Sequence, residues 1–481
     1  MKGPISSHLQ QIHLEAGSKS YRPIAHHQAN ETTYAQEHNE LQANLLSICS
    51  AYLWPRGSYR AACPRPILIH ARHQQQLEEL HEAFNTAITD IIDRWWSDPE
   101  ARFPERMPLE KGEENLLEWL EEQVSRGKLA KYSACQGSWR PDFLVEGDST
   151  NPDAVNAEKF RITEINARFS FNGFMHEAYG QQAVDKMDLG AYGLNSATDA
   201  SKIIDGLFSL FNPALPLHLL KGEEQGIDIH MFIDAVRRRF GVTPRIISPS
   251  DLRLVPNPRN KGANMLCCVA RTDSDFRFLP ETPTMISSGG EIVEEIHQIG
   301  LELHQHELLA LQQEILRQVS LRCFNDMRSI FLIHDKRMLG VVKQEIPSLV
   351  MRGVLSPAQA HILDEGIVDT VLPGSTEMDR LLQASSCSSK LKDQYILKPA
   401  RGGKGAGIVF GEDLSPDEWV SSLKGLQSPE LTTGTTFVVQ ARIKPRLYDV
   451  ILKASGERLQ YPLVAGIGFA RLAVEAHGSV Q

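Results

Sequence analysis

Residues 394–410 read QYILKPARGGKGAGIVF: an apolar strand that ends in a lysine, a loop with four glycines among six residues, and a second apolar strand. Glycines let backbone N–H groups crowd an anion, and Lys398, Arg401 and Lys404 would add positive charge beside it. The loop opens a strand rather than a helix, so it is neither a Walker loop nor a dinucleotide-binding fingerprint. The pattern predicts a hairpin flap over phosphates; a plain glycine-rich turn with solvated charges is the alternative.

A pair of metal-type side chains comes much earlier, in RITEINARFSFNG at 161–173. If this segment begins as a strand, Glu164 and Asn166 point to the same face, about 7 Å apart. A carboxylate and an amide oxygen together suit Mg²⁺, which prefers oxygen ligands and shares them with substrate phosphates. Asp142, on a preceding predicted strand, could supply another carboxylate. The alternative is that these side chains line a solvated sheet face, since Glu-x-Asn alone is a short motif.

Together the two patterns resemble the ATP-grasp superfamily. Most of its members place the lysines before the acidic residues, whereas here Glu164 comes 234 positions before Lys398 (398 − 164). The reversed order resembles the glutathionylspermidine synthase-like branch, which has Arg-x-Asp, then Glu-x-Asn, then Lys-Pro and a glycine loop. The segments NDMRSIFLIHDKRMLG (325–340) and EINARFSFNGF (164–174) also resemble fungal glutathione synthetase-like ATP-grasp proteins. The resemblance covers most of residues 60–465.

The resemblance implies an α/β (α+β) protein with a circularly permuted ATP-grasp fold, a small α/β domain on the substrate side, and ATP and Mg²⁺ as cofactors. Residues 436–445 resemble the family's hinge strand, whose backbone usually hydrogen-bonds adenine. The implied site comprises the metal ligands Asp142, Glu164 and Asn166, the catalytic residues Arg140, Lys398 and Arg401, and the nucleotide-binding residues Lys398, Gly402, Gly403, Lys404, Gly405, Gly407, Gln440 and Ala441.

Two features depart from the family pattern. The separation of Asp142 from Glu164 (164 − 142 = 22) is longer than the family's hairpin, and the extra residues fall in a polar loop at 146–158. After residue 464 the chain ends as AGIGFARLAVEAHGSVQ, where the family continues into a further strand and loop.

Shifts in composition and clusters of loop-forming residues predict four segments. Residues 1–40 are polar and aperiodic, which predicts a disordered N-terminal tail. Residues 41–220 would hold a helical region and the acidic, Mg²⁺-binding half of the ATP-grasp core. Residues 221–345 would form the small α/β domain. Residues 346–481 would form the glycine-rich flap and adenine-hinge lobe.

Hydrophobic periodicity predicts the individual elements. These are helices over 67–96 and around 116–124, strands over 140–143 and 161–167, a helical stretch around 173–212, a linker over 215–226, a helix and two strands over 227–240, 244–247 and 265–270, one long amphipathic helix over 291–319, and a short strand at 331–333 before a helix that begins near 336.

The overall charge excludes one broad class of function. The chain of 481 residues has 50 Lys and Arg against 60 Asp and Glu, a formal net charge of −10. Nucleic-acid binders need a basic surplus to displace counterions from phosphates, so we expect no nucleic-acid partner. No apolar run approaches the roughly 20 residues that span a bilayer, so we expect no membrane partner.

Cysteine usage indicates the compartment. The seven cysteines are scattered, with no Cys-x-x-Cys pair, which is typical of reduced thiols. The adjacent Cys267 and Cys268 lie in an apolar strand and are expected in the core. The first twenty residues have neither the apolar centre of a signal peptide nor the Arg-rich character of a transit peptide. A cytoplasmic location is therefore expected.

The resemblance implies an ATP-dependent carboxylate–amine ligase that forms an amide through an acylphosphate, with a small-molecule carboxylate and amine as partners and a possible place in small-molecule biosynthesis. Two other functions stay open: a degenerate ATP-binding protein without turnover, and a small-molecule phosphotransferase on the same fold. The substrates and the oligomeric state are not encoded in any spacing rule.

Two further groups of polar residues invite a functional interpretation. His297, His304 and His306 suggest a metal site with Glu302, but His304 and His306 would point apart on a helix, so a solvated helix face is preferred. The segment 334–337 is typical of a helix start with Asp335 as its cap, although this region borders the active site in glutathione synthetase-like proteins.

Overall fold

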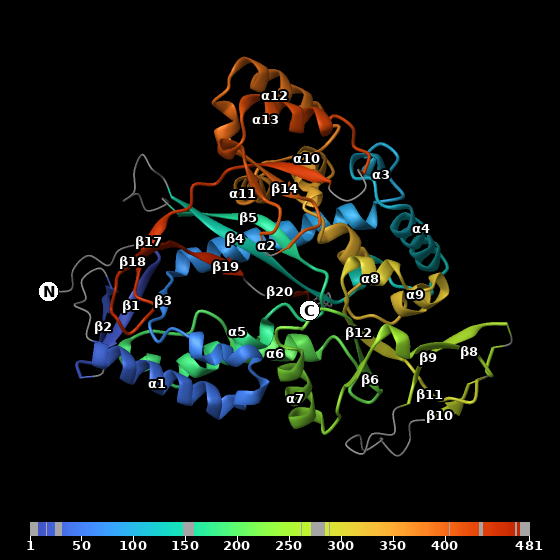
Figure 1. The fold of residues 1–481 in the computed structure, drawn as a ribbon, viewed down its shortest axis with the longest axis horizontal. Coiled ribbons are helices and arrows are strands. Elements are labelled where there is room, and N and C mark those ends of the chain that lie inside the picture. The colour runs from blue at the N-terminus through green and yellow to red at the C-terminus, as the bar shows by residue number, and fades with distance from the viewer. Residues whose placement is uncertain are drawn as a thin grey trace, which may run out of the picture.

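The sheet that positions the candidate site is an antiparallel hairpin near the middle of the molecule (Figure 1). In this computed structural model, β4 (Gly137–Gly147) and β5 (Glu158–Asn166) pair along their length, and β19 (Val464–Gly466) and β20 (Phe469–Arg471) pair with β4. Both predicted strands are confirmed and are longer than expected. The structure describes residues 8–15, 17–24, 31–147, 158–260, 262–270, 284–287, 289–403, 405–431, 436–466 and 469–471.

One face of the hairpin is covered by the long helix α2 (Ala71–Asp93). Trp139 of β4 is buried against it, with its ring 5.6 Å from the ring of Phe84 in a T-shaped contact. The helix predicted over 67–96 is confirmed in its main part. It begins at Ala71 because Ile67–Leu68 forms the short strand β3.

Residues 1–40, predicted to be a disordered tail, contain regular structure in much of their described part. The elements are β1 (Gln10–Glu15), β2 (Ser20–Pro23) and α1 (Glu31–Ile48), with β1 paired to both β2 and β3. The prediction is wrong for these elements because a few buried groups anchor them. Ile12 and Tyr34 are almost fully buried, and the buried Gln11 amide donates to the Arg65 carbonyl oxygen at 3.1 Å.

The region predicted as an α/β unit over 221–345 contributes β7 and β12 to a three-stranded parallel sheet of order β12–β6–β7, whose central strand β6 begins before that boundary. Its elements are β6 (Leu217–Lys221), α7 (Ile229–Phe240), β7 (Arg245–Ile247) and β12 (Gln298–Glu302). The linker predicted over 215–226 is wrong, because β6 is a buried strand between two others. The Pro, Gly and charged residues that suggested a linker lie at the ends of this short apolar strand.

The long helix predicted over 291–319 is also wrong. The segment instead forms β11 (Ile292–Glu295), β12, α8 (Gln305–Leu309) and α9 (Gln313–Ser320). Every residue of β12 is buried, so this strand lacks the alternation that distinguishes a strand from a helix. Gly300 fixes the packing, because a Cβ there would lie 2.7 Å from the Phe324 ring.

A four-stranded antiparallel sheet of order β10–β11–β9–β8 adjoins this unit. Its other strands are β8 (Leu252–Pro256), β9 (Asn264–Val269) and β10 (Thr284–Ile286). Cys267 and Cys268 of β9 are fully buried, which confirms their predicted place in the core.

The C-terminal lobe contains a four-stranded antiparallel sheet of order β13–β16–β14–β15 with α12 and α13 packed beside it (Figure 1). Its elements are α10 (Arg337–Met351), α11 (Pro357–Gly366), β13 (Thr370–Val371), α12 (Thr376–Cys387), β14 (Tyr395–Pro399), β15 (Val409–Phe410), α13 (Pro416–Gly425) and β16 (Phe437–Ala441). The strand, glycine loop and strand predicted over 394–410 are confirmed as the hairpin β14–β15. The short strand predicted at 331–333 is wrong, because Ser329–Ile333 is one buried π-helical turn.

The remaining elements are short or cover the core. They are α3 (Phe103–Arg106), α4 (Lys111–Ser125), α5 (Phe174–Asp185), α6 (Ala200–Phe208), β17 (Leu447–Val450), β18 (Leu459–Pro462) and 3₁₀ helices at Ala51–Leu53, Pro55–Ala61, Tyr132–Ala134, Leu189–Tyr192, Pro249–Asp251, Leu391–Gln394 and Gly411–Asp413. Helices α4, α5 and α6 confirm the helical stretches predicted around 116–124 and 173–212. Within the described residues, no helix has both the length and the apolar character required to cross a membrane.

Candidate active site

The predicted metal ligands lie together on one face of the β4–β5 hairpin. Asp142 is directly opposite Glu164, and Arg140 is directly opposite Asn166. Facing residues of an antiparallel pair have Cβ atoms about 5 Å apart, so the two carboxylates face one another across the strands. The register shift of the hairpin begins only after Asp142. The long polar loop at the far end therefore leaves the pairing of Asp142 with Glu164 in place.

Burial and neighbouring charges act together on this acidic face. Arg140 Nε donates to Asp142 Oδ1 at 3.0 Å, and Arg140 Nη1 also donates to the Asn172 carbonyl oxygen. Burial raises the pKa of Asp142, Arg140 opposes the rise, and the negative charge of Glu164 adds to it. Two carboxylates and an amide oxygen on adjacent strands are a donor set that fits a hard divalent cation, which would relieve this repulsion.

Two lysines face the acidic strand from the C-terminal half of the chain. Lys398 of β14 is 6% exposed, and its Nζ donates to the Thr163 carbonyl oxygen at 3.3 Å. Lys336 Nζ lies 3.3 Å from Glu164 Oε2 and donates to the Gly402 carbonyl oxygen at 2.5 Å. Burial lowers the pKa of Lys398 to about 8, with Glu164 opposing the fall. The lysine strand and the acidic hairpin, 234 positions apart in sequence, are therefore neighbours in space.

The glycine loop has the backbone of a tight hairpin. Gly405 and Gly407 have φ of +73° and +77°, the left-handed region that side chains rarely adopt. At Gly407 a Cβ would also lie 2.9 Å from Pro399 Cγ, whereas at Gly403 nothing lies within 4 Å of it. The structure therefore explains why residue 407 is glycine, whereas it leaves space for a side chain at Gly403. Lys404, a further predicted nucleotide contact, lies outside the described residues.

The predicted hinge residues lie on β16, where Gln440 is buried and Ala441 is partly buried. The Gln440 amide donates to the Thr163 carbonyl oxygen at 3.2 Å and to Thr370 Oγ1 at 3.1 Å, so it ties β16 to β5 and β13. The Ala441 N–H donates to the Asp369 carbonyl oxygen at 2.9 Å. That N–H is therefore occupied, and an adenine contact at Gln440 and Ala441 stays a prediction.

The Arg401 guanidinium is bound to protein carboxylates. Its Nε donates to Asp335 Oδ2 at 2.9 Å, and its Nη2 donates to Glu113 Oε2 at 2.7 Å. Both carboxylates are almost completely buried. Burial would raise the pKa of Asp335, but Arg337 and Arg401 hold it below its ordinary value. The sequence did not predict this network, and a catalytic role for Arg401 stays a prediction.

Two basic residues at the site, Lys336 and Arg168, were not predicted from the sequence to belong to it. Lys336 was assigned to a helix start, and α10 does begin at the next residue, with Asp335 accepting from the Arg337 N–H at 3.0 Å. Arg168 continues the alternation of Glu164 and Asn166, and its Nη2 donates to the Arg401 carbonyl oxygen at 3.2 Å. Burial lowers the pKa of Arg168 to about 10. The alternation Glu-x-Asn-x-Arg was the signal that could have identified Arg168.

The described residues contain one group of three His, Cys, Asp or Glu side chains with closely spaced ligand atoms: His218, Cys268 and Glu294. His218 Nε2 lies 2.6 Å from Glu294 Oε1, and Cys268 Sγ lies 3.5 Å from the same oxygen. Arg245 pairs with that oxygen as well, so a cation already occupies the place a metal would take. We assign the group to the core.

The histidines weighed as metal ligands face different carboxylates, although the rings of His304 and His306 stack with their centroids 5.7 Å apart. His304 Nε2 lies 3.5 Å from Glu224, and His306 Nε2 lies 3.7 Å from Glu223. His304 precedes the first turn of α8, so the predicted solvated face of a long helix is replaced by two histidine–carboxylate contacts.

Comparisons with known proteins show the family of the chain. The chain matches the AnkG N-terminal domain family over residues 80–332, just over half of its length (332 − 80 + 1 = 253 of 481). It is 36% identical over 455 residues to the ATP-grasp enzyme ankG of Aspergillus thermomutatus, which covers 94% of this chain and 91% of that protein.

A solved structure of a glutathione synthetase-like effector (GSS30) from Globodera pallida, in its apo form, aligns with 93% of this chain and 96% of its own. Its sequence identity of 10% and TM-score of 0.47 are too low to support an argument.

The acidic hairpin and the lysine strand with its glycine loop, together with the match to ankG, define a molecule of the ATP-grasp class. Within that class, the chain belongs to the AnkG family. The matched N-terminal domain contains Asp142, Glu164 and Asn166 but ends before Lys398, which lies within the longer alignment to ankG.

Proposed function

We propose that the protein is an ATP- and Mg²⁺-dependent carboxylate–amine ligase whose two active-site halves occur in circularly permuted order. The observation that carries the proposal is the direct pairing of Asp142 with Glu164, next to the buried Lys398 and the ion-paired Lys336. Opposed carboxylates next to lysines are what a site needs if it must hold both a divalent cation and the phosphates bound to it.

The residues divide into two roles. Asp142, Glu164 and Asn166 would hold Mg²⁺, which when bound supplies neutralising charge to the phosphate oxygens. Lys398 and Lys336 would bind phosphate oxygens as point charges. Phosphoryl transfer needs mainly positioning and charge neutralisation, so these side chains need not react covalently.

In the proposed reaction, a substrate carboxylate oxygen attacks the γ-phosphorus of ATP and ADP leaves. The neutral amine of the second substrate then attacks the acyl carbon, phosphate leaves, and the nitrogen loses a proton to give the amide. Arg140 would stabilise negative charge on the acylphosphate. The glycine loop would close over the transferring phosphate and exclude water, which otherwise hydrolyses the acylphosphate.

The test is ATP turnover with Mg²⁺ against a panel of carboxylic acids and amines, with ADP release and product mass read together. The expected result is ADP formation that requires both an acid and an amine, with a product lighter than their sum by one water. A stable phosphorylated product without an amine requirement would support a phosphotransferase instead. Nucleotide binding without ADP release across the panel would support a degenerate nucleotide-binding protein.

Glu164→Gln tests the assignment of the acidic face. We expect turnover to fall by about 10²-fold or more, because a neutral amide holds a divalent cation poorly. Thermal stability should fall only modestly, since the replacement has the same shape but removes the carboxylate that pairs with the buried Lys336. Glu146→Gln, farther along the same hairpin and paired with Arg161, is the matched control and should retain turnover. Parent-level turnover in Glu164→Gln would refute the metal assignment.

A further inference from the structure

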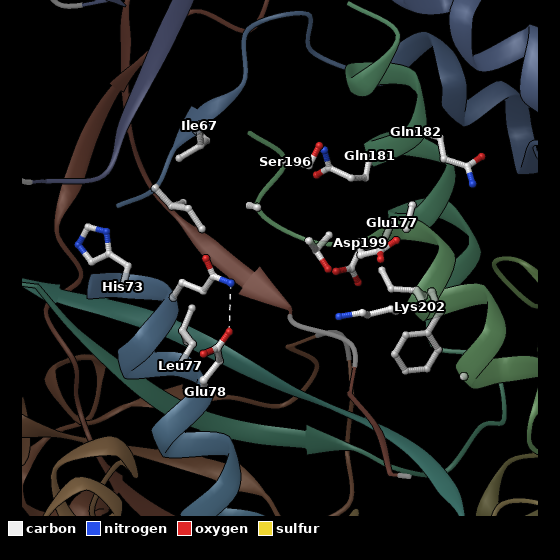
Figure 2. Close-up of a pocket in the computed structure, with 18 of the residues that line it drawn as sticks. Ile67, His73, Leu77, Glu78, Glu177, Gln181, Gln182, Ser196, Asp199 and Lys202 are labelled. Atoms are coloured by element: carbon white, nitrogen blue, oxygen red, sulfur yellow. Dashed lines mark hydrogen bonds between the residues drawn. The ribbon is translucent and has the colours of Figure 1, made fainter. Parts of the chain in front are cut away.

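A cavity of about 1210 Å³ lies between α2 on one side and α5 and α6 on the other (Figure 2). None of the predicted metal, phosphate or hinge residues lines it. Cavities of this size hold small organic molecules, and they occur preferentially where separate elements meet. The cavity is therefore a second candidate binding site, apart from the acidic face.

The deeper wall of the cavity is apolar. It combines side chains from five different elements: Leu77 of α2, Val145 of β4, Phe160 of β5, Phe174 of α5 and Leu207 of α6. All except the half-buried Leu77 are buried side chains of the packed core. This wall would contact the hydrocarbon part of a ligand.

The rim of the cavity is predominantly negative. Figure 2 shows Glu78 on the α2 side and Glu177, Asp199 and Lys202 on the α5–α6 side. Asp185 also lines the cavity, which gives four carboxylates against one lysine. A concave surface lined by one sign of charge concentrates ligands of the opposite sign. His73 does not change this balance, because its Nε2 lies 2.9 Å from the buried Glu158 carboxylate.

Several rim carboxylates are held by neutral donors. Glu78 accepts from the Gln74 amide at 3.0 Å, and Asp185 accepts from the Gln181 amide at 3.0 Å. Asp199 accepts from the Ser201 N–H at 2.9 Å as the N-cap of α6. Amide and hydroxyl donors orient these carboxylates without cancelling their charge.

The cavity adjoins the strand that carries the proposed chemistry. Ser138 lines the cavity and lies two residues before Arg140, on the same face of β4. Phe174 lines it from α5 and follows Gly173, where a Cβ would lie 3.5 Å from Arg140 Nη1. Val145 and Phe160 lie on the other face of the hairpin, so Ser138 and Phe174 are the lining residues that connect the cavity to the Arg140 side. A molecule that extends past them could reach toward Arg140, the residue proposed to stabilise the acylphosphate.

We propose that this cavity binds the amine substrate of the ligase, a molecule with an apolar body and a positively charged group separate from the reacting nitrogen. The assignment rests on the proposed function. The reacting amine must be neutral to attack the acyl carbon, whereas the rim carboxylates favour a charged group. The ligand therefore carries a second ammonium or guanidinium group at the rim, while the nucleophilic nitrogen extends toward Arg140.

The first experiment measures binding to the full chain by NMR or calorimetric titration, without ATP or Mg²⁺. The probes are octylammonium, octanol and octanoate, which share one hydrocarbon chain and differ in charge. We expect octylammonium to bind most tightly and octanoate most weakly, with the preference shrinking as salt rises from about 0.05 M to about 0.5 M. Equal binding of octylammonium and octanoate would overturn the proposal.

Variants tie the binding to this cavity. Glu78→Gln combined with Asp199→Asn removes one charge from each side, and asparagine still caps a helix. We expect octylammonium to bind about threefold more weakly or worse, since each exposed ion pair contributes modestly. Glu79→Gln is the matched control, because Glu79 accepts from Gln75 in the same way but does not line the cavity. Equal affinities in the double variant and the control would place the octylammonium elsewhere and refute the proposal.

Competition distinguishes this proposal from the proposed function. Once the panel assay has identified an amine, octylammonium should raise the KM for that amine and leave the KM for ATP unchanged. Octylammonium binding at the cavity without such competition would refute the amine assignment while the ligase stands. Cavity binding in a protein that forms no amide from the panel would refute the proposed function and reduce the cavity to a cation site.

Discussion

Lys398 carries a positive charge where burial works against it. The side chain is almost completely enclosed, and burial lowers its pKa to about 8 even though Glu164 opposes the fall. A lysine whose pKa is depressed destabilises the folded state at neutral pH, because the unfolded chain solvates the ammonium better. The structure therefore retains a residue that costs stability, which is typical of a group kept for its function.

Lys398→Met should separate stability from function. In nucleotide-free protein at pH 7, we expect the free energy of unfolding to rise by roughly 3 kcal/mol, from the pKa depression, while ATP affinity falls at least about tenfold. Between pH 8 and about 10.5, the unfolded chain binds more protons at this residue than the folded chain. The stability of the parent protein should therefore rise relative to the variant across that window. Denaturant unfolding at several pH values and a nucleotide titration measure both effects; a less stable variant would contradict the argument.

The residues of the acidic face were predictable because they depend on local geometry. Residues two positions apart on a strand point to the same face. The shared face of Glu164 and Asn166 could therefore be predicted from the strand alone. Lys336 reaches Glu164 only through the packing of the segment before α10 against the hairpin, which no local pattern encodes. Asp142 was predictable from the family resemblance, and the register that places it opposite Glu164 required the structure.

Glycine constrains the backbone of the β14–β15 flap at one position and leaves it free at another. Gly407 combines a positive φ with a close approach to Pro399, whereas Gly403 has neither constraint. We expect Gly407→Ala to lower the free energy of unfolding by more than about 1 kcal/mol, because the left-handed backbone and the proline ring both oppose a Cβ. Gly403→Ala is the matched control and should leave stability within about 0.5 kcal/mol of the parent. Thermal unfolding of the two variants tests this difference; similar melting temperatures would contradict it.

Elements were predictable where one side of a helix or strand faces the core. The apolar residues of α2 recur at intervals of three and four positions, and this spacing predicted the helix. The strand β12 is buried at every position, so it presented no alternation, and the segment was assigned to a helix. The strand β1 was not predicted for the opposite reason: its buried positions include polar residues. Gln11 and His13 are buried there with polar partners, the Arg65 carbonyl oxygen and the Glu37 carboxylate.

At the scale of the whole molecule, the carboxylates around Arg401 connect distant parts of the chain. Glu113 lies on α4, Asp335 precedes α10, and Arg401 opens the glycine loop. The order of these segments was readable in the sequence as an acidic half followed by a lysine half. Their contact was not readable, because a buried ion pair between positions 113 and 401 leaves no periodic signal. The network therefore joins the N-terminal helical region to the proposed phosphate-binding flap.

Arg401→Met tests how much this network stabilises the fold. Removing one partner leaves the fully buried Glu113 carboxylate without its main cation, so we expect a loss of about 3 kcal/mol in the free energy of unfolding at pH 7. Glu113→Gln added to Arg401→Met should recover much of that loss, because the uncompensated charge is gone. Recovery would show that the loss comes from Glu113 rather than from lost packing.

The pH dependence of the same variant gives an independent check. Burial already raises the pKa of Glu113 and Arg401 opposes the rise, so removing Arg401 should raise that pKa further. Between the unfolded pKa near 4.5 and the higher folded pKa, the folded state binds more protons than the unfolded state. The stability of Arg401→Met should therefore increase as the pH falls from 7 toward 5, and the double variant should lack this gain. Denaturant unfolding at pH 7, 6 and 5 measures it, and parallel curves for the two variants would show that Arg401 is not the counter-charge of Glu113.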